Sequence, residues 1–220
     1  MAEIVRVTRS KNAARASYNR LSQVYDLMVG GSEEKIRESG LEFLNVQASE
    51  TVLEIGPGTG KALLELARSV GPGGRAYGLD ISDGMLSVAG DRLRKAGLLD
   101  RVQLGCADAV KLPLPTDSID AIYLCFTLEL FDIYEIPLVL GECCRLLHQK
   151  GRICVVGMSR KGKPNPMVRL YEWAHARIPN YVDCRPIQVR EAMEAAGFTT
   201  IKSSLWSLWG LPVEVVLSQK

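Results

Sequence analysis

The sequence lacks the features that mark several common protein classes. No run of five or six like charges occurs, and the formal net charge is +2, so no electrostatic footprint for nucleic acid or an acidic membrane is expected. No stretch approaches the roughly 18 consecutive apolar residues of a membrane span. The first twelve residues contain no apolar h-region, which argues against a signal peptide. We expect a cytoplasmic protein with no integral membrane segment and no nucleic-acid partner.

Metal-site and disulfide patterns are also missing. The six cysteines form no C-x-x-C pair, so we expect free, mostly buried thiols and no metal site. No internal repeat or low-complexity segment is present. With 47% hydrophobic residues over 220 positions, the chain suits one compact domain with a full apolar core, as a monomer or homodimer.

What is present is an alternation of strand-like and helix-like segments from about residue 50 to residue 158. This pattern is typical of a parallel sheet covered by helices on both faces, so the fold class is α/β. The expected strands are 51–55, 75–80, 102–106, 118–126 and 152–158, followed by a hairpin of two short strands at 201–205 and 213–217. The expected helices are 61–70, 83–95 with Ser82 as N-cap, 132–147 and 186–196.

The most informative segment is the glycine-rich turn in Val52-Leu53-Glu54-Ile55-Gly56-Pro57-Gly58-Thr59-Gly60, between a strand and a helix. Glycines there permit positive φ and let a ligand approach the backbone. In open α/β sheets such a turn lies at the carboxyl ends of the strands, where ligands bind. Glycine spacing alone also fits a structural turn, so the assignment depends on other residues.

Two acidic residues supply that support. Asp80 ends the second strand 20 residues after Gly60, close to the separation at which a carboxylate meets ribose hydroxyls. Asp108 follows the third strand and is a candidate for the exocyclic amine of adenine. The alternatives are that Asp80 caps the next helix and that Asp108 makes an Asx turn. A nicotinamide cofactor fits less well, because the third glycine of G-x-G-x-x-G would fall on Lys61.

Together these segments resemble the class I S-adenosylmethionine-dependent methyltransferases. Residues 52–60 resemble motif I, 78–82 the acidic post-I motif, 108–109 motif II and 118–131 motif IV. The segment 18–28 is similar to the N-terminal helix of the quinone-biosynthesis C-methyltransferases of the UbiE type. The resemblance implies a Rossmann-like, seven-stranded, mostly parallel sheet with an antiparallel last strand. The cofactor that it implies is S-adenosylmethionine, with S-adenosylhomocysteine as the product.

The resemblance also implies a set of cofactor-binding residues. The candidates are Glu54, Gly56, Gly58, Gly60, Asp80, Ile81, Met85, Asp108, Ala109 and Cys125. The first four would surround the methionine and ribose portions, the next three the ribose and adenine, and Asp108 with Ala109 the adenine edge. The backbone at Cys125 would meet the amino group of the cofactor.

Catalytic residues are less well defined. A sulfonium methyl is already activated, so the main task is to hold a nucleophile in line behind it. A general base is needed only if the acceptor loses a proton, and Glu129 and His175 are the candidates, with solvated or packing roles as the alternatives. The candidate substrate-pocket residues, which equally fit core packing, are Tyr18, Tyr25, Tyr171 and Tyr181.

We therefore expect one methyltransferase domain of four parts. They are a helical cap (1–45), a cofactor-binding core (46–158), a lid-like insertion (159–185) and a C-terminal helix and hairpin (186–220). The expected reaction is direct in-line methyl transfer to a small, largely apolar and lipophilic acceptor, with a quinone-type ring as the analogue that the resemblance suggests. A thiol, amine or lipid-headgroup acceptor remains open, as does a non-catalytic subunit that binds S-adenosylmethionine.

Overall fold

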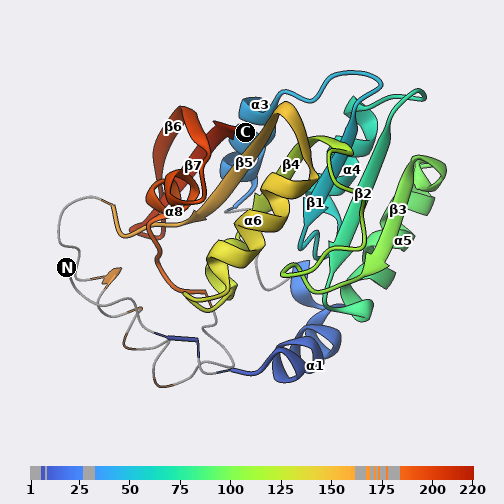
Figure 1. The fold of residues 1–220 in the computed structure, drawn as a ribbon. Helices are drawn as coiled ribbons and strands as arrows, with labels where there is room; N and C mark the ends of the chain where they lie inside the picture. The colour runs from blue at the N-terminus through green and yellow to red at the C-terminus, as the bar shows by residue number, and fades with distance from the viewer. Residues whose placement is uncertain are drawn as a thin grey trace.

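The protein is built around one mixed sheet (Figure 1). The computed structural model describes residues 6–7, 9–26, 33–161, 167–168, 171, 173, 177 and 184–220. The strands are β1 (Thr51–Ile55), β2 (Arg75–Asp80), β3 (Val102–Cys106), β4 (Ile119–Cys125), β5 (Leu147–Met158), β6 (Thr199–Leu208) and β7 (Leu211–Gln219). Their order is β3-β2-β1-β4-β5-β7-β6, and only β7 runs antiparallel to its neighbours. This confirms the predicted seven-stranded, mostly parallel sheet.

Helices cover both faces of the sheet, as predicted. One face packs against α3 (Glu34–Leu44), α4 (Lys61–Ser69) and α5 (Asp83–Lys95), and the other against α6 (Ile136–Leu146) and α8 (Val189–Ala195). The central strands β1, β4 and β7 are buried on both sides, which explains their near-continuous apolar sequences. No helix in the described part of the chain has the length and apolar character needed to cross a bilayer.

The C-terminal hairpin is longer than the sequence predicts. Leu208 pairs with Leu211, so that only Trp209 and Gly210 form the turn. Both have positive φ, 51° and 82°, as a two-residue turn matching the twist of the strands requires. The Leu-Pro pair at 211–212, expected in the turn, therefore belongs to β7.

The helix predicted at 132–147 is also corrected, since α6 begins at Ile136 and its last predicted residue opens β5. In the sequence, Asp132 followed by Glu135 three residues later resembles a capping box, of which only half forms. Glu135 accepts a hydrogen bond from the backbone of Asp132 at 3.2 Å, whereas Asp132 accepts from the backbone of Tyr134. The Asp132 carboxylate also binds Arg6 at 2.8 Å.

The carboxyl ends of the parallel strands define where a ligand would bind. The chain order reverses between β1 and β4, and in open α/β sheets the crevice at this switch point is the usual ligand site. The short helix α1 (Lys11–Leu21) contacts α5 and lies outside the two helix layers (Figure 1). It therefore closes the side of the molecule toward which β2 ends.

Candidate functional site

The glycine turn after β1 lies at the centre of the site. Gly56, Gly58 and Gly60 all have positive φ, from 53° to 80°. The prediction that the turn uses glycine to adopt positive φ is therefore confirmed at all three positions. A Cβ on Gly56 would lie 2.5 Å from Thr127, whereas one on Gly58 would meet nothing within 4 Å. Gly58 therefore borders open space, while Gly56 allows the turn to approach the end of β4.

Gly60 does not line the cavity, which corrects one prediction. A Cβ there would lie 2.8 Å from the Cβ of Ala89 on α5, and Gly60 is the N-cap of α4. Its role is to let two helices pack closely. The motif spacing could not distinguish this glycine from those that face a ligand.

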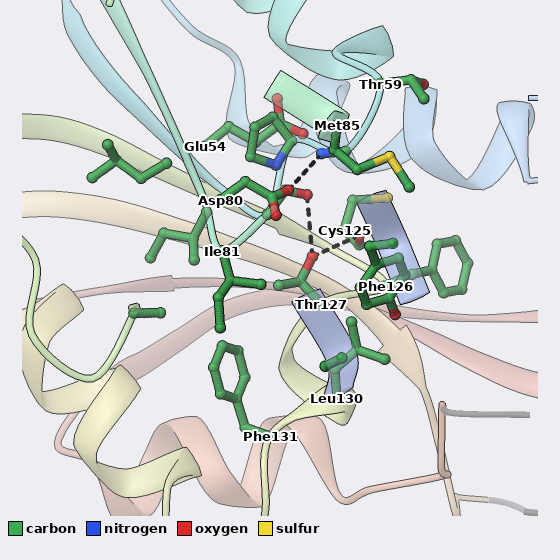
Figure 2. A pocket seen from close by; sticks show the side chains of 18 of the residues that line it. Glu54, Thr59, Asp80, Ile81, Met85, Cys125, Phe126, Thr127, Leu130 and Phe131 are labelled. Carbon is green, nitrogen blue, oxygen red and sulfur yellow. Dashed lines mark hydrogen bonds between the residues drawn. The ribbon is translucent and has the colours of Figure 1, made fainter. Parts of the chain in front are cut away.

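Asp80 lies at the end of β2, beside the glycine turn (Figure 2). Its Oδ2 accepts a hydrogen bond from Gly58 N at 3.1 Å and its Oδ1 accepts one from Ser82 N at 2.9 Å. Burial raises the pKa of Asp80, and the hydrogen bonds from these backbone donors offset part of that rise. Each carboxylate oxygen has two lone pairs, so each can accept a further hydrogen bond from a ligand.

Asp108 makes the Asx turn that was the alternative to an adenine-binding role, accepting a hydrogen bond from Val110 N at 3.2 Å. Its other oxygen pairs with Lys11 Nζ at 2.6 Å, and the same ammonium contacts Glu135 at 2.7 Å. Asp108, Lys11 and Glu135 all line the cavity. The start of α1 is thus tied to the carboxylate that the sequence assigns to adenine.

A cavity of about 220 Å³ connects these groups. Nine of the ten candidate cofactor residues line it, namely Glu54, Gly56, Gly58, Asp80, Ile81, Met85, Asp108, Ala109 and Cys125. Tyr18 and Tyr25 also line it, with their rings edge-to-face at 6.5 Å. The structure therefore brings together residues that are distant in the sequence, from the strand ends and from the segment around α1.

The side of the cavity after β4 is mostly apolar. Phe126, Leu130 and Phe131 line it (Figure 2). Phe126 has φ of 51°, an uncommon conformation for a bulky residue, and such strain is often found at functional sites. The Thr127 hydroxyl donates to the backbone oxygen of Cys125 at 3.0 Å, which fixes the turn that carries these side chains.

The opposite end of the cavity is rich in charge. Glu54 is 3% exposed, and its Oε2 has no hydrogen-bond partner among the described residues. Burial raises the pKa of Glu54 to about 8, with a partly offsetting contribution from Arg37. Burial likewise raises the pKa of Glu33 to about 6. A buried, unpartnered carboxyl group in a cavity is suited to a cationic ligand.

The remaining predicted residues are not at the cavity or fall outside the described chain. Glu129 is fully buried, does not line the cavity and accepts a hydrogen bond from Met158 N at 3.0 Å. Its proposed role as a base facing the pocket is therefore wrong, because the turn directs it toward β5. Tyr171 is half-buried and does not line the cavity. His175 and Tyr181 lie outside the described residues.

Sequence analysis missed Asp26, which lines the cavity and accepts from the Thr59 hydroxyl at 2.7 Å. Despite its partial burial, hydrogen bonds from Thr59 and Arg92 hold the pKa of Asp26 below its ordinary value. Lys61 Nζ lies 3.3 Å from the same carboxylate. The only available signal was its place in the segment that resembles the UbiE N-terminal helix. No group of side chains suited to a metal ion occurs in the described parts of the chain.

Sequence comparisons relate the core of the chain to a known family. Residues 52–151 match the family described as "Methyltransferase domain". The ubiquinone/menaquinone biosynthesis C-methyltransferase UbiE of Ectopseudomonas mendocina (strain ymp) is 32% identical over 164 residues, which cover 72% of this chain and 63% of that protein. The chain spans less than two thirds of the length of the first curated relatives that it matches.

Solved structures show the same fold at low identity. The cyclase SpnF has a TM-score of 0.77 at 17% identity, covering 100% of this chain and 99% of that chain. A SAM-dependent methyltransferase from Aquifex aeolicus has a TM-score of 0.68 at 20% identity, covering 91% and 97%. Sequence and fold together identify a class I, Rossmann-like S-adenosylmethionine-dependent methyltransferase domain that is similar to UbiE.

Proposed function

We propose that this chain is an S-adenosylmethionine-dependent methyltransferase acting on a small, largely apolar acceptor. The observation that carries the proposal is the convergence of Glu54, Asp80 and Asp108, from three neighbouring strands, on one cavity beside the glycine turn. S-adenosylmethionine offers an ammonium, two ribose hydroxyls and an exocyclic amine. Each is a hydrogen-bond donor that a carboxylate accepts.

The assignment of Glu54 to the methionine ammonium rests on its burial and its unpartnered Oε2 among the described residues. An unpaired buried carboxylate is costly, so an incoming cation gains a strong electrostatic partner there. Arg37 and Lys61 also line this end of the cavity and carry the charge that the methionine carboxylate requires. The charges at this end thus complement both groups of the amino acid portion.

The acceptor half of the cavity has a different chemistry. When bound, the cofactor would supply a methyl group on a sulfonium, with the carbon–sulfur electron pair left on sulfur when the acceptor forms its new bond. Phe126, Leu130 and Phe131 line this region, and we expect them to exclude water and to orient an apolar acceptor. Positioning of this kind contributes on the order of 7 kcal/mol or more to lowering the barrier.

A quinone-type ring is our first choice of acceptor. The support is the apolar acceptor half of the cavity together with the names of the relatives, which include UbiE and a demethylmenaquinone methyltransferase from Lactobacillus johnsonii that is 30% identical over 160 residues. The likeness to the cyclase SpnF is a reason to test turnover directly, since the same fold carries more than one reaction.

The experiment is a binding and turnover assay. Calorimetry with S-adenosylmethionine measures the affinity, and a methyl-labelled cofactor is then incubated with reduced quinones, phenols, thiols and amines. We expect saturable binding and labelled product with a reduced quinone. Absence of binding refutes the cofactor assignment. Tight binding without turnover on any acceptor class would instead favour a non-catalytic subunit.

A further inference from the structure

The helix α1 is attached to the core without any fully buried side chain. None of its residues is buried, although Lys11, Ala14 and Tyr18 line the cavity. Most stable helices are fixed by an apolar face packed on the core. Its apolar side chains Ala14, Tyr18 and Leu21 are only half-buried, so polar contacts contribute strongly to holding α1 in place.

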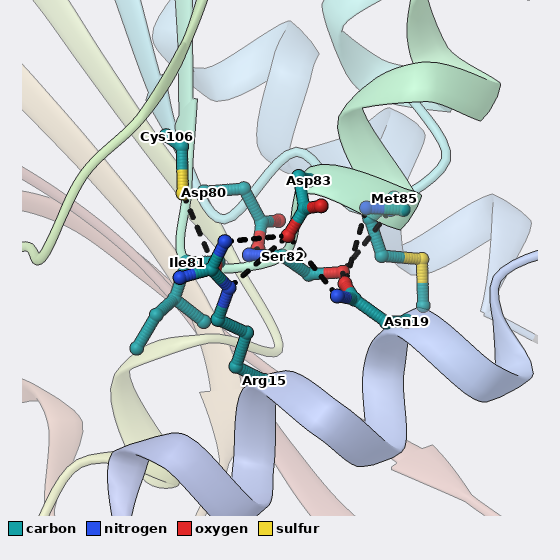
Figure 3. Close-up of polar contacts among 9 residues, drawn as sticks. Arg15, Asn19, Asp80, Ile81, Ser82, Asp83, Met85 and Cys106 are labelled. Atoms are coloured by element: carbon teal, nitrogen blue, oxygen red, sulfur yellow. Dashed lines mark hydrogen bonds and ion pairs between the residues drawn. The ribbon is translucent and has the colours of Figure 1, made fainter.

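Two residues of α1, Arg15 and Asn19, contact the turn formed by residues 82–84, between the end of β2 and the first turn of α5 (Figure 3). Asn19 Oδ1 accepts a hydrogen bond from the Ser82 hydroxyl at 2.6 Å and another from Gly84 N at 3.1 Å. Its Nδ2 donates to Asp83 at 3.0 Å. One side chain of α1 thus contacts three consecutive residues of this turn.

The same turn carries the proposed ribose-binding carboxylate. Ser82 is fully buried, caps α5 by accepting from Met85 N at 3.1 Å, and donates its own backbone N–H to Asp80. A Cβ on Gly84 would lie 2.9 Å from the Cα of Asn19, so the helix backbone approaches the turn as closely as glycine permits. Asn19 is therefore linked to Asp80 through Ser82, without lining the cavity itself.

We propose that Asn19 is a positioning residue that couples the docking of α1 to the geometry of Asp80. The inference rests on the proposed function, because Asp80 is taken as the ribose ligand. When α1 docks, Asn19 fixes Ser82 and hence the orientation of the Asp80 carboxylate. By reciprocity, cofactor binding at Asp80 strengthens the docking of α1, which in turn closes Lys11 and Tyr18 over the ligand.

Arg15 provides a matched control on the same helix. Its guanidinium contacts Asp83 at 2.8 Å (Figure 3), but both side chains are about half exposed, at 48% and 60%. An exposed ion pair of this kind contributes little to stability. The side-chain contacts of Arg15 are with Asp83 and not with Ser82 or Asp80, so its loss should weaken α1 docking slightly without releasing the turn.

The test compares Asn19→Ala, Arg15→Ala and the exchange variant Asn19→Asp/Asp83→Asn in the full chain. The exchange keeps a carboxylate–amide pair between the two positions and an acceptor for Ser82 and Gly84. Calorimetry measures the dissociation constant of S-adenosylmethionine, and thermal melting reports folding. Hydrogen exchange of residues 11–21, with and without ligand, measures α1 docking.

We expect Asn19→Ala to raise the dissociation constant about tenfold, since two donors at the turn lose their acceptor. Arg15→Ala should change it less than about threefold, and the exchange variant should stay within about threefold of the native protein. The ligand should slow exchange of residues 11–21 in the native protein and in Arg15→Ala, and not in Asn19→Ala. A purely structural role of Asn19 would change melting without removing this ligand effect.

Native affinity or native ligand-induced protection in Asn19→Ala would overturn the coupling. If Asn19→Ala does not fold, the exchange variant decides, because tenfold weaker binding with native melting would also overturn it. Failure of the native protein to bind S-adenosylmethionine would count against the proposed function, which separates the two conclusions.

Discussion

Replacing Glu54 by glutamine tests the electrostatics of the cavity most directly. Burial raises the pKa of Glu54 to about 8 from an ordinary value of 4.5. Between these values the folded protein holds a proton that the unfolded chain has released, so raising the pH favours unfolding. This contribution to stability is complete below pH 4.5 and is lost as the pH rises to about 8.

The magnitude follows from the linkage relation. Each pH unit within this window removes at most about 1.4 kcal/mol of unfolding free energy. From pH 6 to pH 8 the native protein should therefore lose roughly 2 to 3 kcal/mol relative to Glu54→Gln, whose amide does not titrate. Urea unfolding at pH 6, 7 and 8 measures both proteins, and their difference cancels the contributions of other groups.

The same group predicts the effect of the ligand. An ammonium beside Glu54 favours the carboxylate, so S-adenosylmethionine binding should release a proton near pH 6.5. Calorimetry in two buffers of different ionisation enthalpy detects this proton, and Glu54→Gln should abolish it. Identical pH slopes of stability for the native and variant proteins would refute the reasoning, whatever the affinity for the ligand.

Three further predictions concern other parts of the site. Asp80→Ala should weaken S-adenosylmethionine binding about ten- to a hundredfold, whereas Asp91→Ala, an exposed carboxylate on α5, should not; equal affinities would count against the ribose assignment. Gly60→Ala should lower the melting temperature by several degrees, because the added methyl group would collide with Ala89. An unchanged melting temperature would show that α4 and α5 can move apart without cost. Gly58→Ala should lower the free energy of unfolding by about 1 to 2 kcal/mol, because the position has a positive φ. Its larger effect should be weaker ligand binding, so calorimetry measures the affinity and thermal melting the stability.

The sheet and most of the cofactor candidates were accessible from sequence because their signals are local. The predicted bounds 51–55, 75–80 and 102–106 match β1, β2 and β3, since each is a short strand-like segment that is followed by the polar or glycine residues of the ligand edge. Ser82 as the cap of α5 is likewise confirmed. Their order in the sheet then brings the ends of these strands together.

Orientation was harder to predict than position. Gly60 and Glu129 occupy the expected segments, but Gly60 faces Ala89 and Glu129 faces the backbone of β5. Each lies within one or two residues of a cavity-lining position, and a turn of non-repeating φ and ψ reverses the direction of neighbouring side chains. Sequence spacing does not record that reversal, so motif membership alone overestimated the cavity.

The contacts across the cavity depend on long-range packing and had no sequence signal of their own. Lys11 reaches Asp108 across 97 positions, and Asp26 reaches Arg92 across 66. These ion pairs connect the segment around α1 to the buried core, although no residue of the α1 helix is itself buried. Because the core forms one side of the cavity and this segment the other, ligand binding must stabilise their association. The stability of α1 should therefore depend on cofactor concentration more than that of any core strand.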